Sequence, residues 1–230
     1  MIYLDNAATS FPKPEEVYAF MDTFYRAHGV NPGRSGYDAS REAGEMVDET
    51  RRLMTGLFHG TDWNRLCFGY NATDALNLVI QGMLDEGDHA ITTVLEHNSV
   101  LRPLHHLSRS RHVEVDHVPC DVRGFVDPDE FRRRFRPNTR LVIVSHASNV
   151  VGTVQPVREI GARCREAGIP FVIDASQTAG VVPIDVEAMN VDVVAFTGHK
   201  SLMGPTGIGG LYVREGVEIR LTRAGGTGVR

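Results

Sequence analysis

Apolar residues recur at helical spacing in two segments near the amino terminus. In the first segment the apolar side chains stand three or four positions apart, at Val17, Phe20, Met21 and Phe24. In the second, the apolar side chains of residues 43–57 share one helical face. A glycine-rich loop, residues 29–36, separates them. The pattern predicts two amphipathic helices within an amino-terminal helical segment, residues 1–60, ahead of the first core strand.

Beyond residue 60, short apolar runs alternate with helical patterns. The runs that predict strands are residues 66–68, 90–94, 113–118, 141–144, 171–173, 193–196 and 209–213, and the helical patterns are 75–84, 100–107 and 157–167. This alternation predicts an α/β fold, a mainly parallel sheet with helices on both faces. No repeat or linker divides the chain, so we expect one large domain. In such sheets, ligands bind beyond the carboxyl ends of the strands.

Composition and charge narrow the class of protein. The 230 residues are 42% hydrophobic, with a net charge of −5, and the longest basic run is the triplet Arg132-Arg133-Arg134. We interpret the triplet as a solvated helix face and expect no nucleic-acid partner. Neither a basic leader followed by an apolar stretch nor a membrane-length apolar segment is seen, which predicts a cytoplasmic protein without a membrane partner.

The cysteines and histidines do not form a metal-binding pattern. Cys67, Cys120 and Cys164 are odd in number and far apart, so we interpret them as reduced thiols that serve packing. The adjacent His105 and His106 have no carboxylate or cysteine at ligand spacing. We therefore assign no metal.

The run at residues 193–196 ends in a hydroxyl, a histidine and a lysine. Thr197, His199 and Lys200 follow this run and precede a turn rich in glycine and proline. Burial and nearby cations lower the pKa of a lysine in such a place, which suits its amine to attack an aldehyde. The alternative is a surface lysine in a loop. A phosphate-binding P-loop is disfavoured because a histidine separates Gly198 from Lys200.

An acid directly follows the apolar run 171–173. A buried carboxylate needs a cation or hydrogen-bond donors, and a protonated pyridine nitrogen is one suitable partner for Asp174. Alternatively, Asp174 is the N-cap of a following helix. Gln177, three residues further along, can donate to a phenolic oxygen.

Residues 70–74 lie between a predicted strand and a predicted helix. Free amides at that helix start, with the Thr73 hydroxyl, would make an anion site suited to a phosphate. Ordinary capping by Asn71, Thr73 or Asp74 is the alternative. No Gly-x-Gly-x-x-Gly follows a strand, which disfavours a dinucleotide site.

Two more polar clusters, residues 94–99 and 144–152, stand at strand ends. His97 in the first offers a flat ring and a titratable nitrogen, and Asn149 in the second can hydrogen-bond a ring substituent. A structural role is the alternative for His97.

Taken in order, six segments resemble the cysteine desulfurase family, a group of class V aminotransferases. They are Tyr3-Leu4-Asp5-Asn6-Ala7-Ala8-Thr9, Asn31-Pro32-Gly33-Arg34-Ser35-Gly36, Glu96-His97-Asn98-Ser99, Ser148-Asn149-Val150-Val151-Gly152, Asp174-Ala175-Ser176-Gln177 and Thr197-Gly198-His199-Lys200. The resemblance implies the pyridoxal 5'-phosphate (PLP) transferase fold of type I, with residues 1–230 as its PLP-binding large domain.

The resemblance also implies a role for each candidate residue. Lys200 would form an imine with PLP, and His97 would stack on the cofactor ring; these two are the expected catalytic residues. The remaining cofactor contacts would be Asp174 at the pyridine nitrogen, Gln177 at the phenolic oxygen, Asn149 nearby, and Ala72, Thr73, Thr197 and His199 around the phosphate. PLP would act as an electron sink for an amino-acid substrate.

The activity implied is removal of sulfur from L-cysteine, giving alanine and an enzyme persulfide. A sulfur-acceptor protein and a homodimer belong to the same expectation. The alternatives are a selenocysteine lyase or another class V aminotransferase, and a truncated, non-catalytic remnant that serves as a binding or dimerisation partner. A nucleotide-binding protein is a remote option because both phosphate-loop patterns are missing.

This sequence departs from the family pattern at its carboxyl terminus. The chain stops within the glycine-rich residues 225–230, where family members continue into a small carboxyl-terminal domain. That domain normally supplies the sulfur-accepting cysteine and an arginine for the substrate carboxylate, unless Arg34 replaces this arginine. We therefore expect that the chain alone binds PLP but does not desulfurate cysteine.

Overall fold

The computed structural model describes residues 2–32 and 36–225. Residues 33–35, which include Arg34, and residues 226–230 lie outside the described part. The substitute role expected for Arg34 and the glycine-rich terminus therefore have no structural account.

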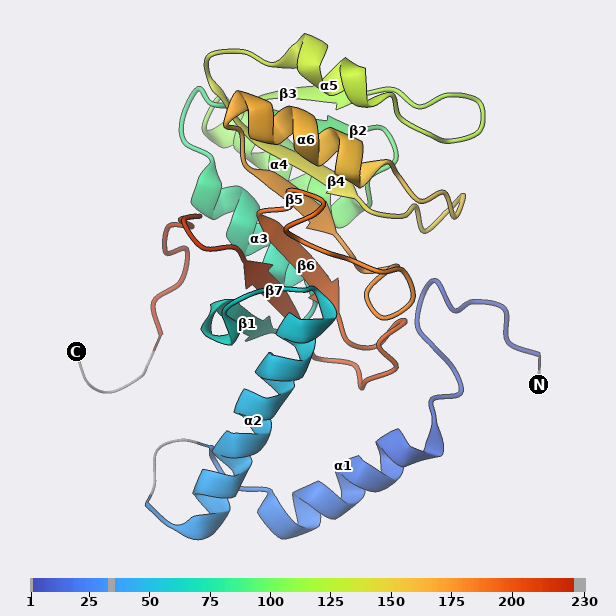
Figure 1. Cartoon of the computed structure of the whole chain (residues 1–230), viewed down its shortest axis with the longest axis vertical. Helices are drawn as coiled ribbons and strands as arrows, with labels where there is room; N and C mark the ends of the chain where they lie inside the picture. Colours follow the sequence, from blue (N-terminus) through green and yellow to red (C-terminus); the bar gives the residue numbers. More distant parts are fainter. Residues whose placement is uncertain (1, 33–35, 226–230) are drawn as a thin grey trace.

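A seven-stranded sheet forms the centre of the molecule (Figure 1). Its strands are β1 (Leu66–Gly69), β2 (His89–Thr93), β3 (Glu114–Val118), β4 (Thr139–Ser145), β5 (Phe171–Asp174), β6 (Val193–Thr197) and β7 (Gly209–Val213). They lie in the order β1-β7-β6-β5-β4-β2-β3. Four neighbouring pairs are parallel: β3–β2, β2–β4, β4–β5 and β5–β6. The pairs β6–β7 and β7–β1 are antiparallel. This arrangement confirms the mainly parallel α/β sheet.

Helices cover both faces of that sheet, as predicted (Figure 1). On one face lie α3 (Ala72–Met83) and α4 (Asn98–Ser110), and on the other lie α5 (Pro128–Arg134) and α6 (Val157–Ala167). The apolar pattern did not predict α5, a short helix that buries only Phe131. The arginine triplet forms its last turn. No helix of the described ranges is long and apolar enough to cross a membrane.

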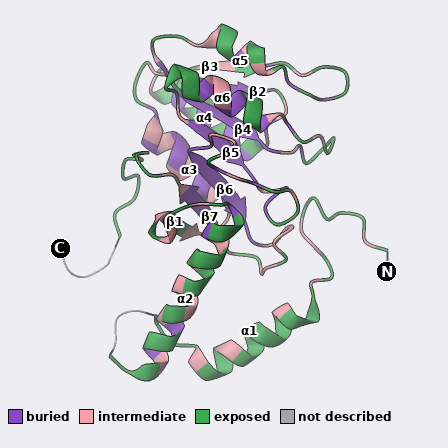
Figure 2. Ribbon diagram, in the orientation of Figure 1, coloured by how far each residue is buried: buried purple, intermediate pink, exposed green. Residues whose placement is uncertain are grey.

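Strand alternation divides the core between the two faces. In β4, Leu141 and Ile143 pack with the α3 and α4 side chains, whereas Val142 and Val144 pack with those of α5 and α6. All four are fully buried, and the ribbon of the central strands is coloured as buried in Figure 2. Because both faces of the central strands are covered, these strands read as unbroken apolar runs in the sequence.

The two amino-terminal helices extend away from the sheet (Figure 1). They are α1 (Glu15–His28) and α2 (Asp38–Leu57), and the short helix η1 (Trp63–Arg65) follows before β1. Both predicted helices are confirmed. However, α1 buries none of its residues, and Phe20 on its apolar side is 55% exposed. The described part of the chain therefore covers the apolar side of α1 only in part, since Val17, Met21 and Phe24 are half-buried.

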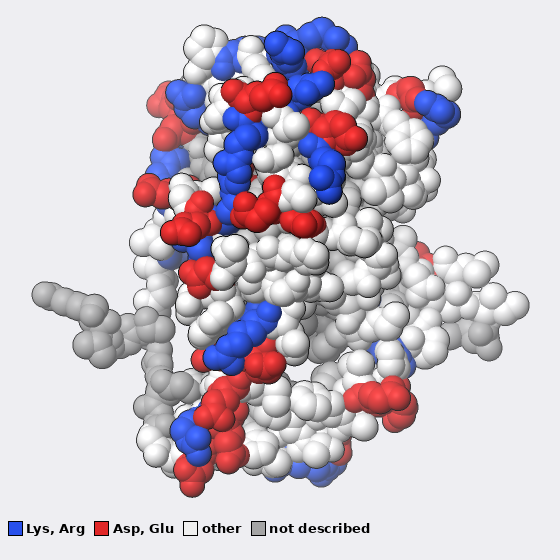
Figure 3. Space-filling view, viewed as in Figure 1, with Lys and Arg blue, Asp and Glu red and all other residues white. Residues whose placement is uncertain are grey.

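Charged side chains of both signs are interspersed over α5 and α6 (Figure 3). Arg133 pairs with Asp127 and Glu130, and Arg163 pairs with Asp129 across the two helices. The triplet therefore lies in a mixed-sign surface, with Arg133 and Arg134 both paired to Glu130.

The cysteines differ in their environments. Cys164 on α6 is buried, and burial raises the pKa of its thiol. Cys120 is half-buried. The prediction that Cys67 serves packing is wrong, because its side chain is exposed. Alternate residues of a strand point to opposite faces, and on the edge strand β1 Leu66 takes the buried side.

Candidate active site

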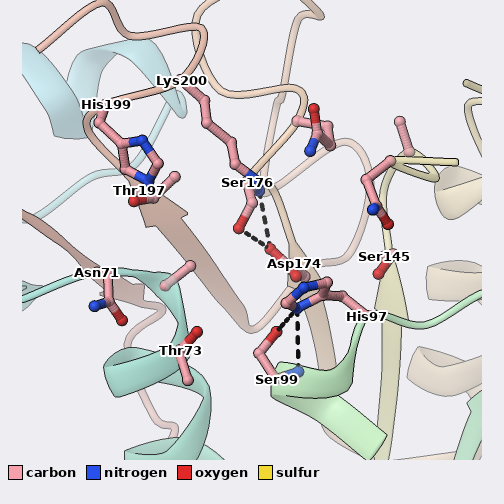
Figure 4. A pocket seen from close by; sticks show the side chains of 14 residues that line it. Asn71, Thr73, His97, Ser99, Ser145, Asp174, Ser176, Thr197, His199 and Lys200 are labelled. Atoms are coloured by element: carbon pink, nitrogen blue, oxygen red, sulfur yellow. Dashed lines mark hydrogen bonds between the residues drawn. The ribbon is translucent and has the colours of Figure 1, made fainter. Parts of the chain in front are cut away.

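A pocket lies at the carboxyl ends of the parallel strands, beside the starts of α3 and α4 (Figure 4). It is lined by Asn71, Ala72, Thr73, His97, Ser99, Ser145, Ala147, Asn149, Asp174, Ser176, Gln177, Thr197, His199 and Lys200. All nine residues proposed from the sequence are among them. The fold brings these segments together because the ends of parallel strands meet at one edge of the sheet.

Lys200 enters the pocket from the loop after β6 (Figure 4). Its side chain is half-buried, and burial lowers the pKa of its amine, while the charge of Asp174 acts in the opposite direction. A lower pKa leaves more of the amine neutral near pH 7, which is the form that attacks an aldehyde. The structure therefore places Lys200 in the pocket and not on open surface.

Asp174 ends β5 and is only 5% exposed. Its Oδ1 accepts hydrogen bonds from the Ser176 N–H, at 2.9 Å, and from the Ser176 hydroxyl (Figure 4). The alternative of a helix N-cap is wrong, because residues 176–181 form turns. Oδ1 stabilises that turn, and the carboxylate also lines the pocket.

The His97 ring is held by the start of α4. Its Nδ1 accepts the Ser99 N–H at 3.1 Å and lies 2.8 Å from Ser99 Oγ (Figure 4). Because Nδ1 accepts, the neutral ring carries its proton on Nε2. His97 thus has a structural role as the N-cap of α4 in addition to lining the pocket. The cap fixes the ring in one orientation.

The start of α3 forms another wall. Asn71 is its N-cap, since Asn71 Oδ1 accepts the Asp74 N–H at 2.9 Å. The N–H groups of Ala72 and Thr73 belong to the first helical turn and have no acceptor inside the helix. Gly209 of β7 lets this turn approach the sheet, since a Cβ there would lie 2.6 Å from Asn71 Cα. The helix start therefore remains available to an anion.

Thr197 Oγ1 is buried without a hydrogen-bond partner. Thr197 lines the same pocket as Thr73 and the α3 start. A buried hydroxyl without a partner costs folding free energy, so such an atom in a pocket indicates a ligand that accepts its hydrogen bond.

The residues after Asn6 lie against the loop that carries Lys200. The His199 carbonyl oxygen accepts hydrogen bonds from Thr9 Oγ1 at 2.9 Å, from the Ser10 N–H at 3.1 Å and from Lys13 Nζ at 3.0 Å. His199 Nδ1 lies 3.0 Å from Thr9 Oγ1. Burial, and then the charges of Lys200 and Lys13, lower the pKa of His199. The position of Lys200 therefore depends on residues far from it in sequence.

Gln177 also contacts this amino-terminal segment. Its Nε2 donates to the Ala7 carbonyl oxygen at 2.9 Å. The resemblance implies that the Gln177 amide donates to a cofactor oxygen, whereas in the structure it donates to a backbone oxygen. The cofactor role of Gln177 stays a prediction.

Five lining residues were not proposed from the sequence: Asn71, Ser99, Ser145, Ala147 and Ser176. Ser145 directly follows the apolar run 141–144, and the strand-end rule that selected Asp174 also selects it. Asn71 and Ser99 stand at helix starts, where capping explained their presence without a ligand.

The side chains of the pocket fit PLP. A half-buried amine suits the aldehyde, a buried carboxylate suits a protonated pyridine nitrogen, and a fixed imidazole presents a flat face. The unpartnered Thr197 hydroxyl beside the α3 start suits a phosphate. Among the residues that the structure describes, no group of three potential metal ligands occurs.

Comparison with known proteins places these observations in a family. The family model described as aminotransferase class-V matches residues 2–230. Cysteine desulfurase IscS of Dictyoglomus turgidum is 35% identical over 230 residues, covering 98% of this chain and 57% of the relative. Cysteine desulfurase IscS of Glaesserella parasuis is 39% identical over 226 residues, covering 96% and 55%.

Solved structures give the same result. SspA in complex with cysteine superposes with a TM-score of 0.91 and 31% identity, over 98% of this chain and 65% of that one. The apo cysteine desulfurase from Thermococcus onnurineus NA1 superposes with a TM-score of 0.87 and 34% identity, over 93% and 54%. The chain thus spans a little over half the length of the curated relatives it matches.

Proposed function

Since the chain belongs to the class V aminotransferase family, we propose that its pocket binds PLP and serves the removal of sulfur from L-cysteine, giving alanine and an enzyme-bound persulfide. One observation carries the proposal: Lys200, Asp174, His97 and the unpartnered Thr197 hydroxyl line one pocket. The relatives named as cysteine desulfurases, and the neighbour solved with cysteine, support the choice of reaction.

Each of these residues has a task that follows from its surroundings. When bound, PLP withdraws electrons from an amino-acid substrate attached to it. Lys200 would hold the cofactor aldehyde through its amine, whose pKa is lowered by burial. Asp174 keeps a proton on the ring nitrogen, because its carboxylate is buried and has few other partners. His97 presents its ring face and an Nε2–H donor.

The cysteines of the chain do not supply the reacting thiol. All three lie among the described residues, and none lines the pocket. Burial also raises the pKa of Cys164, which keeps that thiol protonated. We therefore predict that the 230-residue chain by itself releases no sulfide from cysteine. An assay of sulfide and alanine tests this, and turnover by the chain that is lost in Cys67→Ser or Cys120→Ser would contradict it.

Covalent labelling tests the pocket directly. The chain contains two lysines, Lys13 and Lys200. Borohydride reduction of the PLP-loaded chain, followed by peptide mapping, should place the pyridoxyl group on Lys200. Lys13→Arg should keep the label, and Lys200→Arg should lose it. A label on Lys13 alone, or none despite bound PLP, overturns the assignment.

The homodimer, a sulfur-acceptor protein and the large-domain boundaries remain predictions from the resemblance, and the cytoplasmic location remains a prediction from the sequence. Sedimentation of the purified chain over a range of concentrations tests the homodimer. Selenocysteine lyase activity is tested in the same assay by replacing cysteine with selenocysteine.

A further inference from the structure

A buried carboxyl group stands directly behind the pocket, outside the set of lining residues. Glu96 follows β2 and is 7% exposed. Its Oε2 accepts both the N–H and the hydroxyl of Ser145, at 2.8 and 2.7 Å. Its Oε1 accepts the Thr93 hydroxyl at 2.7 Å. Three donors therefore meet one buried carboxyl group.

These hydrogen bonds connect two parts of the pocket. Glu96 directly precedes His97, and Ser145 ends β4, where it pairs in register with Asp174 of β5. The Glu96 carboxyl therefore ties the turn that carries His97 to the strand beside Asp174. The Thr93 hydroxyl, which also accepts the Leu95 N–H at 3.0 Å, closes the same turn.

We propose that Glu96 is a positioning residue of the pocket, which holds the His97 ring and the Ser145–Asp174 edge at the spacing that a flat cofactor ring requires. The ligand in this inference is the one given by the proposed function, PLP. The geometry comes from the hydrogen bonds of Glu96 alone.

The protonation of Glu96 adds a pH dependence to this role. Burial raises the pKa of Glu96 to about 7 against the effect of its three donors, and the charge of Asp174 raises it further. The titratable groups nearby are Asp174 on β5, His97 beside it in the chain, and His146, whose Nδ1 lies 2.9 Å from Thr178 Oγ1. The charge of Asp174 in turn acts on Lys200, which lines the same pocket.

A cation bound at Asp174 would change this balance. A protonated ring nitrogen there offsets the Asp174 charge, and the pKa of Glu96 then falls. Near pH 7 the ionised carboxylate accepts all three donors, whereas the protonated form must turn one of those bonds around. The pocket is therefore held most firmly when the cofactor is present.

Two neighbouring threonines provide a matched pair of variants. Thr93 and Thr92 are both fully buried on β2, but the Thr92 hydroxyl donates to the Ile143 carbonyl oxygen at 2.9 Å and not to Glu96. Thr93→Val removes a donor from Glu96, and Thr92→Val removes an equivalent hydrogen bond elsewhere.

Amide NMR of the chain without cofactor is the first measurement. The Ser145 N–H reports on Glu96, and the Ser99 N–H reports on the His97 ring. In the wild type, we expect the amide chemical shift of Ser145 to titrate with a midpoint near pH 7. The midpoint should move to higher pH in Thr93→Val and stay in place in Thr92→Val. In Glu96→Gln the titration should disappear. The Ser99 shift should move in Glu96→Gln and not in Thr92→Val.

PLP binding, followed by visible circular dichroism, is the second measurement. We expect Glu96→Gln to weaken PLP binding about tenfold and to change the dichroism of the bound ring. An unchanged Ser99 shift with unchanged dichroism in Glu96→Gln, or equal effects of Thr92→Val and Thr93→Val, overturns the proposal. If wild type binds no PLP, the proposed function fails, while the NMR titration still decides the role of Glu96.

Discussion

At the scale of single residues, the pocket contains a polar atom that lowers the stability of the fold. Thr197 Oγ1 is buried and unpartnered, and Val has nearly the same shape without the hydroxyl. Thr197→Val should therefore stabilise the ligand-free chain by about 1 kcal/mol, a rise in Tm of about 3 °C for a chain of this length. It should also weaken PLP binding. Thermal unfolding with and without PLP measures both effects.

Thr178→Val is the control for that substitution. Thr178 is equally buried, but its Oγ1 bonds the His146 ring. This variant should lower the Tm, because it leaves a buried nitrogen without its partner. A Tm that falls in both variants would show that the Thr197 hydroxyl is satisfied in solution, and would remove the argument for a ligand at that atom.

A second prediction at this scale concerns the charge of Asp174. Asp174→Asn keeps an oxygen that accepts the Ser176 N–H, so the turn after β5 should persist. Because the carboxylate raises the pKa of Lys200, its loss should lower that pKa further below the ordinary lysine value. In a Lys13→Arg background, peptide mapping separates the modification of Lys200 from that of the α-amino group, and the midpoint of Lys200 modification should shift to lower pH.

The matching control is Asp127→Asn, at the exposed N-cap of α5. It lies outside the pocket and should leave the Lys200 midpoint unchanged. A midpoint that stays in place in Asp174→Asn would mean that Asp174 does not act on the amine.

The sequence predicts the residues that line the pocket better than it predicts the residues that hold them in position. Asp174 and Lys200 follow apolar runs, and that position alone predicts the carboxyl edge of the sheet. Glu96 also lies in a polar strand-end cluster, but its partner Ser145 is 49 positions away. No local pattern predicts which strand will lie beside β2. The burial of Glu96 and its hydrogen-bond donors therefore could not be inferred from the sequence.

At the scale of elements, the distance between α3 and β7 controls the anion-binding wall. A Cβ on Gly209 would lie 2.6 Å from both Asn71 Cα and the Phe196 carbonyl oxygen. Gly209→Ala should therefore push the α3 start outward, lower stability by about 2 kcal/mol, and weaken binding of inorganic phosphate. Urea unfolding and phosphate titration measure these effects.

Gly56→Ala serves as the comparison. Gly56 lies in α2, and a Cβ there would meet no atom within 4 Å. This change should leave phosphate binding unaltered and raise stability slightly, since alanine favours the helix. If both variants bind phosphate as wild type does, the α3 start is not the anion site.

The helical elements show where pattern reading fails. Spacing predicts α1 correctly as a helix, but the described residues cover its apolar side only in part, and none of its residues is fully buried. Conversely, α5 has one buried side chain, so its seven residues carry too little apolar periodicity to be recognised. Periodicity reports the face of an element and not what lies against it.

At the scale of the whole molecule, two buried groups give stability opposite dependences on pH. Glu96 has a raised pKa, so its contribution is fully present below pH 4.5 and is lost as pH rises through about 7. His146 has a pKa lowered to about 4, so its contribution is present above pH 6.5 and is lost as pH falls. Over the range they share, each slope is about 1.4 kcal/mol per pH unit, with opposite sign.

Removing one of these two groups should reveal the pH dependence of stability that the other one causes. In Glu96→Gln the acid-sensitive contribution of His146 is no longer offset, so stability relative to wild type should rise as pH increases from 5 to 7. Urea unfolding of both proteins across that range measures the difference. A constant difference between the two curves would show that Glu96 does not change protonation there.

The bonds to the His199 carbonyl oxygen also set a condition on biosynthesis. Thr9 leaves the ribosome's catalytic centre 190 residues before its partner His199 exists. At translation rates of about 5–20 residues per second, that interval is about 10–40 s. During that time β2, β3, β4 and β5 can pair with one another, whereas Thr9, Ser10 and Lys13 lack the carbonyl oxygen that they bind. The segment around Thr9 is therefore among the last to take its position, and the proposed PLP site is complete only after the loop at Lys200 has emerged.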